Sequence, residues 1–146
     1  MIYLEEKNGA TENSEIAEFT KSAWKDADLE HYGRSDIDFT KKEYTLVAKN
    51  EDNKIMGILY FEIEVNVCFV DTLLVGKKFQ NNGIGTKLLD YAEKFAKEKK
   101  CTKIYLETNE GWDAVKFYKK RGYKNTGVHE KHILGKNSLF FTKFFK

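Results

Sequence analysis

Two stretches in the middle of the chain, residues 44–49 and 54–65, are mostly apolar, and Glu62 and Glu64 alternate with apolar neighbours near the end of the second. The turn-forming residues 50–53 between the two stretches are typical of a hairpin, so both stretches are predicted to be β-strands. Residues 67–75 follow after a tight connection and are mostly apolar or β-branched, which is typical of a strand buried on both faces. We expect this third strand to lie at the centre of a sheet.

The hydrophobic period lengthens to that of a helix in the second half of the chain. Apolar residues recur every three or four positions over 83–100, and lysines gather towards the end of this stretch, which predicts an amphipathic helix. The patterns that follow predict a strand over 103–109, a helix over 112–121 that ends at Gly122, and terminal strands over 123–128 and 138–146.

The N-terminal part of the chain carries weaker patterns. We expect a short strand over 2–7 and a helix that begins at Asn13 or Ser14 and runs to about Lys25. Residues 26–38 are rich in Asp and Glu and have no sustained period. They are predicted to form a loop with room for one helical turn.

The order of these elements predicts one α/β domain over residues 1–146. A helical crossover joins 67–75 to 103–109, so these two strands should pair in parallel at the centre of a mixed, mostly antiparallel sheet of about six or seven strands, surrounded by about four helices. Ligands of such sheets gather beyond the carboxyl ends of the parallel strands. Val75, the loop after it and Asn109 are therefore expected at the ligand-binding end.

Composition supports a folded α/β domain and argues against a role in nucleic-acid binding or in a membrane. The 146 residues are 41% hydrophobic and 33% charged, with 11 Phe and 8 Tyr, which is too apolar for a disordered chain. The formal charge of +2 gives no electrostatic reason to expect nucleic acid as a partner. The N-terminus has no basic segment followed by an apolar one, and no apolar run approaches the roughly 20 residues of a membrane helix, so we expect a cytoplasmic protein without membrane contact.

The cysteines and histidines carry no evident metal motif. Cys68 and Cys101 are far apart in the sequence, and His31, His129 and His132 do not complete a zinc-binding set with them. We expect reduced, partly buried thiols and no metal site.

Residues 80–86, with the sequence Gln-Asn-Asn-Gly-Ile-Gly-Thr, join the central strand to the strongest predicted helix. Gly83 and Gly85 allow positive φ angles and close backbone approach, and the first N–H groups of a helix have no intrahelical partners. With the helix dipole and the Thr86 hydroxyl, the loop has the donors of a pyrophosphate site. The order Gly-Thr-Lys and the bulky Leu88 exclude a Walker loop and a dinucleotide fingerprint. By itself, the loop could equally be a turn that only starts a helix.

These residues form part of a longer pattern. The order and spacing of Leu73-Leu74-Val75, Gln80-x-x-Gly83-x-Gly85, Ala114, Phe117-Tyr118 and Gly122-Tyr123 resemble the GNAT superfamily of N-acetyltransferases over roughly residues 40–146. The resemblance implies a GNAT-like fold, acetyl-CoA as the cosubstrate, and direct transfer of its acetyl group to an amine. It also implies that backbone amides from about Asn82 to Thr86 hold the pyrophosphate.

The resemblance assigns a set of cofactor contacts: Leu73, Leu74, Val75, Gln80, Asn81, Asn82, Gly83, Ile84, Gly85, Thr86, Asn109, Phe117 and Tyr118. Two positions depart from the family pattern. Lys77 replaces a common proline, and Gly111 replaces the asparagine that usually helps to hold the pantetheine arm. Asn109 can take over that contact only if the loop bends to bring it in.

Transfer to an amine needs three groups of the protein. In the family, a backbone N–H of the central strand, here around Leu73 or Leu74, polarises the thioester carbonyl. The resemblance makes Tyr118 the expected proton donor to the leaving thiolate, although its spacing alone suits an aromatic core residue. The amine is mostly protonated at neutral pH and must pass a proton to a base or a water relay. Asp71 and Glu107 are equal candidates for that base, and both could instead be sheet carboxylates that pair with lysines.

The identity of the acceptor is left open by the sequence. The acidic segment 26–38 would suit a small cationic amine or a peptide amine, but a solvated loop carries the same charges. Two other classes of function are alternatives. One is a non-catalytic acyl-CoA-binding module, and the other is an interaction domain that forms a homodimer by strand addition through the Phe-rich residues 138–146.

Overall fold

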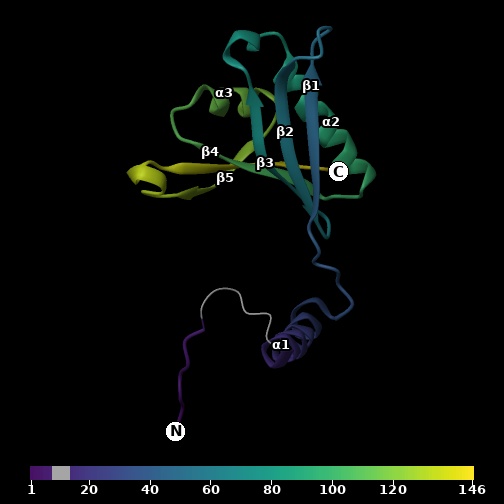
Figure 1. Cartoon of the computed structure of the whole chain (residues 1–146), viewed down its shortest axis with the longest axis vertical. Helices are drawn as coiled ribbons and strands as arrows, with labels where there is room; N and C mark the ends of the chain where they lie inside the picture. The colour runs from purple at the N-terminus through teal and green to yellow at the C-terminus, as the bar shows by residue number, and fades with distance from the viewer. Residues whose placement is uncertain (8–13) are drawn as a thin grey trace. The chain divides into compact units, whose positions relative to one another are not determined.

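The computed structural model describes residues 1–7 and 14–146, and the chain divides into two units, Met1–Asp38 and Phe39–Lys146 (Figure 1). The first unit contains helix α1 (Ser14–Tyr32). The N–H of Gly33, at a φ of 70°, bonds to the carbonyl of Leu29 at 3.1 Å and closes the last turn of this helix.

Two predictions for the first unit are wrong. Residues 2–7 do not form a strand, because no strand among the described residues pairs with them and an unpaired strand leaves its backbone groups unsatisfied. Residues 26–32, predicted to be a loop, continue helix α1, since Ala27 and Leu29 are good helix formers and scattered carboxylates do not break a solvated helix. The predicted start at Asn13 lies outside the described residues.

The second unit is built on a sheet of six strands, counted over the described part of the chain. The strands are β1 (Lys42–Lys49), β2 (Ile55–Glu64), β3 (Val67–Val75), β4 (Lys103–Asn109), β5 (Lys124–His129) and β6 (Ser138–Phe144). They lie in the order β1-β2-β3-β4-β6-β5. Strands β3 and β4 pair in parallel and the other neighbours are antiparallel, which confirms the predicted central parallel pair.

Two α-helices complete the second unit. Helix α2 (Ile84–Glu98) is the crossover between β3 and β4, and helix α3 (Asp113–Lys120) lies between β4 and β5. Short 3₁₀ turns η1 (Lys77–Phe79) and η2 (Ile133–Gly135) occur in the loops. The described residues thus form three α-helices rather than about four. None of these helices has the length and apolar content needed to cross a membrane.

Strand β6 lies inside the sheet and not at its edge. It pairs with β4 on one side and with β5 on the other. The predicted route to a homodimer through residues 138–146 is therefore wrong, because strand addition requires an edge with unpaired N–H and C=O groups.

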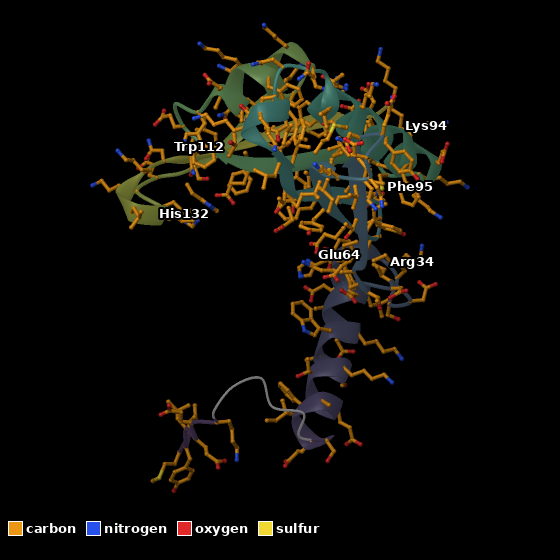
Figure 2. The ribbon with its side chains drawn as sticks, turned by 45° about the horizontal axis from the view of Figure 1, so that its top comes forward. Arg34, Glu64, Lys94, Phe95, Trp112 and His132 are labelled. Carbon is orange, nitrogen blue, oxygen red and sulfur yellow. The ribbon has the colours of Figure 1, made fainter. Side chains whose placement is uncertain are left out.

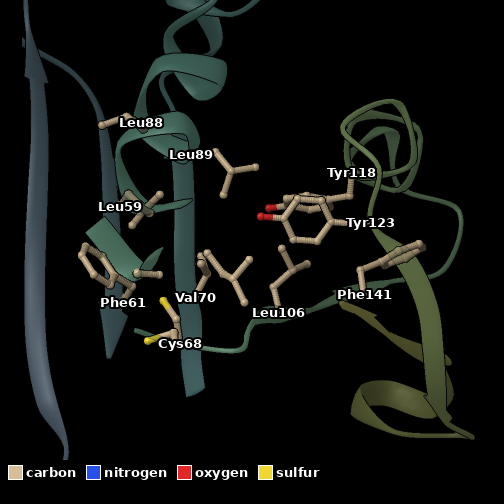
Figure 3. Close-up of a cluster of buried hydrophobic side chains, with 14 of the residues drawn as sticks. Leu59, Phe61, Cys68, Val70, Leu88, Leu89, Leu106, Tyr118, Tyr123 and Phe141 are labelled. Atoms are coloured by element: carbon tan, nitrogen blue, oxygen red, sulfur yellow. The ribbon is translucent and has the colours of Figure 1, made fainter. Parts of the chain in front are cut away.

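The core lies between the sheet and the two helices of this unit. Alternate residues of β2, namely Leu59, Phe61 and Ile63, are buried in one cluster with Leu88 and Leu89 of α2 (Figure 3). Burial of each such side chain contributes about 1.5–3 kcal/mol. This packing fixes the start of α2 against the end of the sheet.

Strand β3 carries a β-bulge that changes which of its side chains face the helices. Its register with β2 shifts between Tyr60 and Phe61, which leaves Asp71 as an extra residue. Beyond the bulge, Leu73 lines the helix-covered face, whereas Leu74 faces away with 59% of its surface exposed. The prediction of a strand buried on both faces is therefore wrong for this end of β3, because α2 and α3 cover the opposite face.

The central parallel pair separates beyond this bulge. The pairing of β3 with β4 ends at Val70 and Leu106, while β3 continues along β2 to Val75 and β4 continues along β6 to Asn109. The carboxyl-terminal parts of β3 and β4 are thus not joined to each other by ladder hydrogen bonds within the described residues. The open edge of β3 lies at the end of the sheet where α2 begins.

Candidate active site

Helix α2 begins with three backbone N–H groups that have no intrahelical partner. Its N-cap residue, Gly83, has φ 75° and ψ 9° and makes no side-chain cap. The first intrahelical hydrogen bond runs from the N–H of Lys87 to the carbonyl of Gly83 at 3.0 Å. The N–H groups of Ile84, Gly85 and Thr86 therefore point out of the helix end, where the dipole favours a negative charge.

Two side chains brace the loop that leads to this helix end. Gln80 Nε2 donates to the carbonyl of Val75 at 3.1 Å. Asn82 Nδ2 donates to the carbonyls of Phe79 and Gln80 at 3.3 and 3.1 Å. These hydrogen bonds hold the loop against the end of β3, so the N–H groups at the helix end keep their direction without a ligand.

A cleft of about 530 Å³ lies at this end of α2 and extends to α3. Most of the predicted cofactor contacts meet in it: Leu73, Val75, Gln80, Asn81, Gly83, Ile84, Gly85, Thr86, Phe117 and Tyr118. Phe79, Asp113 and Ala114 also line the cleft and were not among the predicted contacts. Ala114 belonged to the family pattern, whereas no sequence signal singled out Phe79 or Asp113.

Three predicted contacts do not line the cleft. The bulge turns Leu74 to the other face of the sheet, and Asn82 uses its side-chain amide within the loop. Asn109 pairs with Ser138 on β6 and follows Thr108, which is buried on the core side, so the Asn109 side chain points to the opposite face. The loop therefore does not bring Asn109 to the position that Gly111 leaves without an amide.

Tyr118 is a buried member of the cleft wall. Its surface is 6% exposed, and its ring packs edge-on against Phe117 and Tyr123 at centroid distances of 5.2 and 5.6 Å (Figure 3). Burial raises the pKa of the Tyr118 phenol to about 12, because a phenolate there would lose its hydration. The phenol is therefore protonated at neutral pH and can act as a proton donor.

The open edge of β3 supplies further backbone donors. The N–H of Gly76 bonds to the carbonyl of Met56 on β2 at 2.9 Å. Because successive N–H groups of a strand point to opposite sides, those of Val75 and Leu73 point away from β2, to the side where pairing with β4 has ended. Of the two predicted carbonyl-polarising positions, this geometry favours Leu73 over Leu74.

The first candidate base, Asp71, lies outside the cleft. As the bulge residue it is exposed, and it accepts a hydrogen bond from the Thr72 hydroxyl at 2.8 Å. Together with Glu43 and Glu62 it lines a separate pocket of about 340 Å³ over strands β1 to β3. Asp71 thus belongs to an acidic surface.

The second candidate base, Glu107, also lies outside the cleft. Its Oε1 is 3.2 Å from His129 Nδ1 and 3.8 Å from His132 Nε2. The Ser138 hydroxyl, and after it His129, lower the pKa of the Glu107 carboxyl group, which is ionised at neutral pH. Sequence analysis missed this cluster, because no spacing rule connects a residue of β4 with a histidine at the end of β5 and another in the loop that follows it.

Residues 10–123, more than half of the chain, match the model of the acetyltransferase (GNAT) family. The chain belongs to the GNAT family. A relative in Bacillus subtilis (strain 168), the uncharacterized protein YxbD, is 38% identical over 76 residues, which are 51% of this chain and 46% of that protein. The chain spans about half the length of YxbD and of YdhI, a second matching protein of this bacterium.

Solved structures show the same GNAT fold. An acetyltransferase from Bacillus cereus ATCC 14579 has a TM-score of 0.75 and 30% sequence identity, over 99% of this chain and 100% of that one. A putative streptothricin acetyltransferase from Bacillus anthracis str. Ames, solved in complex with acetyl coenzyme A, has a TM-score of 0.65 and 25% identity, over 70% of this chain and 62% of that one. The predicted GNAT-like α/β fold is confirmed.

Proposed function

We propose that this protein transfers the acetyl group of acetyl-CoA to a primary amine by direct attack in a ternary complex. The observation that carries the proposal is the composition of one cleft. It combines the unpaired N–H groups at the start of α2, the open edge of β3 and the buried, protonated Tyr118. The B. anthracis relative, which was solved with acetyl coenzyme A, supports the choice of cofactor.

The cleft would hold the two halves of the cofactor by different means. The pyrophosphate accepts hydrogen bonds from the N–H groups of Ile84, Gly85 and Thr86, where the helix dipole adds to the attraction. The pantetheine arm lies along the open edge of β3, where the N–H of Val75 has no ladder partner on β4. This edge recognition replaces the side-chain amide that is missing at Gly111.

Each step of the transfer has a group assigned to it. The amine nitrogen attacks the thioester carbonyl, and the N–H of Leu73 stabilises the negative charge that develops on the carbonyl oxygen. The carbon–sulfur bond then breaks, and Tyr118 donates its proton to the leaving thiolate. The amine gives one proton to a carboxylate or to water before it attacks and a second one as the new C–N bond forms, and the second proton returns through water to the Tyr118 phenolate, which completes the balance.

The acceptor reaches the thioester from the sheet face opposite the helices. Both candidate bases, Asp71 and Glu107, belong to that side. The pocket beside Asp71 is also lined by Glu43 and Glu62, and Glu62 Oε1 already holds the Lys41 ammonium at 2.7 Å. A surface with this charge suits a small cationic amine or a lysine side chain.

A non-catalytic acyl-CoA-binding module is the second candidate function. The observation that favours it is Gly111 in place of the usual asparagine, together with the orientation of Asn109 away from the cleft. Binding without turnover would then be the whole activity.

Two measurements separate these candidates. Calorimetry with CoA tests the cleft, and thiol release from acetyl-CoA with a panel of cationic and neutral amines tests the reaction. We expect binding and amine-dependent thiol release. Binding without release with any amine would favour the non-catalytic module, and the absence of heat with CoA would contradict both functions.

The base is tested by comparing Asp71→Asn with Glu107→Gln in buffer that contains a chelator. Loss of the base should lower kcat by about a hundredfold or more while the affinity for CoA is unchanged. Equal, near-normal kcat values in both variants would assign the proton transfer to water.

A further inference from the structure

Three metal-ligating side chains meet outside the cleft. Glu107 comes from β4, His129 ends β5, and His132 lies in the following loop, directly before η2. Their ligand atoms, one carboxylate oxygen and two imidazole nitrogens, all lie within 4.8 Å of one another. Figure 2 shows His132 at the outer end of the hairpin formed by β5 and β6.

The loop between β5 and β6 is tied down by its own hydrogen bonds. The N–H of His132 bonds to the carbonyl of Lys136 at 2.8 Å. The Asn137 side chain accepts from the N–H of Lys131 at 3.0 Å and donates to Glu110 Oε2 at 3.1 Å. Asn137 thereby joins the loop to the residue that follows β4, the strand that carries the carboxylate of the cluster.

Packing also restrains the two imidazole rings. The His129 ring lies edge-on to Phe140 at a centroid distance of 4.6 Å, and the two histidine rings are 5.0 Å apart. Lys131 and Leu134 have φ values of 47° and 52°, a left-handed conformation that costs roughly 1 kcal/mol for each residue. The hydrogen bonds and ring contacts offset this cost and keep the histidines beside β4.

Two of the three distances between ligand atoms of the cluster are close to those of a zinc site. Bonds of about 2.0–2.1 Å in tetrahedral geometry place neighbouring ligand atoms about 3.3 Å apart. Glu107 Oε1 lies 3.2 Å from His129 Nδ1 and 3.8 Å from His132 Nε2. Both histidines are about half exposed, which leaves room for the side-chain rotations that binding of a metal ion requires.

We propose that Glu107, His129 and His132 form a binding site for one divalent transition-metal ion, with Zn²⁺ as the expected occupant. Imidazole nitrogens favour Zn²⁺, Co²⁺ and Ni²⁺ over Mg²⁺ and Ca²⁺, which prefer oxygen ligands. Three protein ligands leave a coordination position for water. A bound ion also engages the Glu107 carboxylate and removes it from proton transfer.

The test is a calorimetric titration of the untagged full chain with ZnCl₂, together with the visible absorption of its Co²⁺ complex. We expect one ion per chain and the intense bands of four-coordinate Co²⁺. His129→Ala and His132→Ala should each weaken binding by about tenfold or more, the range in which even supporting groups of metal sites act. The thiols of Cys68 and Cys101 are buried and do not compete in the folded protein.

His31→Ala is the matched control, because this histidine lies on α1 and is no member of the cluster. Glu107→Gln keeps the side-chain shape and repeats the test if a histidine variant does not fold. Absence of Zn²⁺ binding in the wild type, or equal weakening by His31→Ala, would overturn the proposal. Calorimetry with CoA on the same variants should be unchanged, so failure of the metal site and failure of the cleft are distinguished.

Discussion

At the scale of single residues, burial decides the chemistry of Tyr118. The position of Tyr118 in the sequence suits either a core aromatic or a proton donor, and the folded chain combines both features. The ring belongs to the buried cluster while the residue lines the cleft. Its pKa of about 12 means that the phenol is protonated at neutral pH and carries a proton that it can donate.

Substitution of this phenol should separate catalysis from binding. Tyr118→Phe keeps the ring and its packing, so we expect kcat to fall by about tenfold or more while the Kd for acetyl-CoA stays within about twofold. Steady-state thiol release and calorimetry measure the two quantities. Tyr91→Phe, which changes an exposed phenol of α2, is the control. Wild-type kcat in Tyr118→Phe would remove this residue from the mechanism.

At the scale of elements, the start of α2 combines helix stability with ligand binding. Gly85 is the second residue of this helix, and a Cβ there would lie 3.7 Å from Phe117 and Val75, at ordinary contact distance. Glycine is therefore not required by the fold at this position, although it weakens a helix relative to alanine. Its lack of a side chain keeps the cleft wall open for a phosphate.

Gly85→Ala should accordingly change stability and affinity in opposite directions. We expect the free energy of unfolding to rise by up to about 1 kcal/mol, because alanine is the better helix former. Binding of CoA should weaken by about tenfold, the equivalent of one charge-assisted hydrogen bond. Urea denaturation and calorimetry measure the two effects. An unchanged CoA affinity would place the pyrophosphate elsewhere.

At the scale of the whole sheet unit, one buried carboxylate connects three elements. Glu93 of α2 is 7% exposed and accepts hydrogen bonds from the Tyr123 hydroxyl at 3.1 Å and from Lys143 Nζ of β6 at 2.8 Å. Arg121, which follows α3, lies 3.5 Å from the same carboxylate and also pairs with the exposed Asp90. The group ties α2 to the end of α3 and to β6.

The two carboxylates that Arg121 contacts should differ in their contribution to stability. Glu93→Gln leaves two cations of this network without their buried partner, so we expect a loss of about 1.5–3 kcal/mol. Asp90→Asn removes an exposed ion pair and should cost less than about 1 kcal/mol. Urea denaturation of both variants makes the comparison. Equal losses would show that burial of Glu93 does not govern its contribution.

The stability of the unit should also fall in alkaline solution. Burial raises the pKa values of Cys68 and Tyr118 to about 12, whereas unfolded Cys and Tyr ionise at about 8.5 and 10. The unfolded chain loses these protons first, so the stability that the two protonated groups give is fully present below about pH 8 and is lost as the pH rises towards 12. Each group that is ionised only in the unfolded chain lowers the free energy of unfolding by about 1.4 kcal/mol per pH unit.

Urea denaturation at about pH 8 and about pH 11 measures this loss. Tyr118→Phe removes one of the two groups and should lower the difference between the two pH values. The same difference in the variant and the wild type would contradict the assigned effect of Tyr118.

Sequence reasoning succeeded where the signal is local. Helical spacing of apolar residues located α2 and α3, the turn residues 50–53 located the hairpin of β1 and β2, and the glycine loop marked the end of β3 that borders the cleft. It failed at residues 26–32, where many charges without a sustained period predict a loop, although charged residues are compatible with a solvated helix.

The sequence by itself determined the order and type of the helices and strands from β1 to α3, because hydrophobic spacing and turn residues depend only on neighbours along the chain. The tertiary structure alone decided which face each side chain occupies beyond Asp71, since one extra residue in β3 reverses the alternation and turns Leu74 away from the cleft. It also decided that Glu107 meets His129 and His132. Strand pairing brings such distant residues together, and this pairing cannot be predicted from their spacing along the chain.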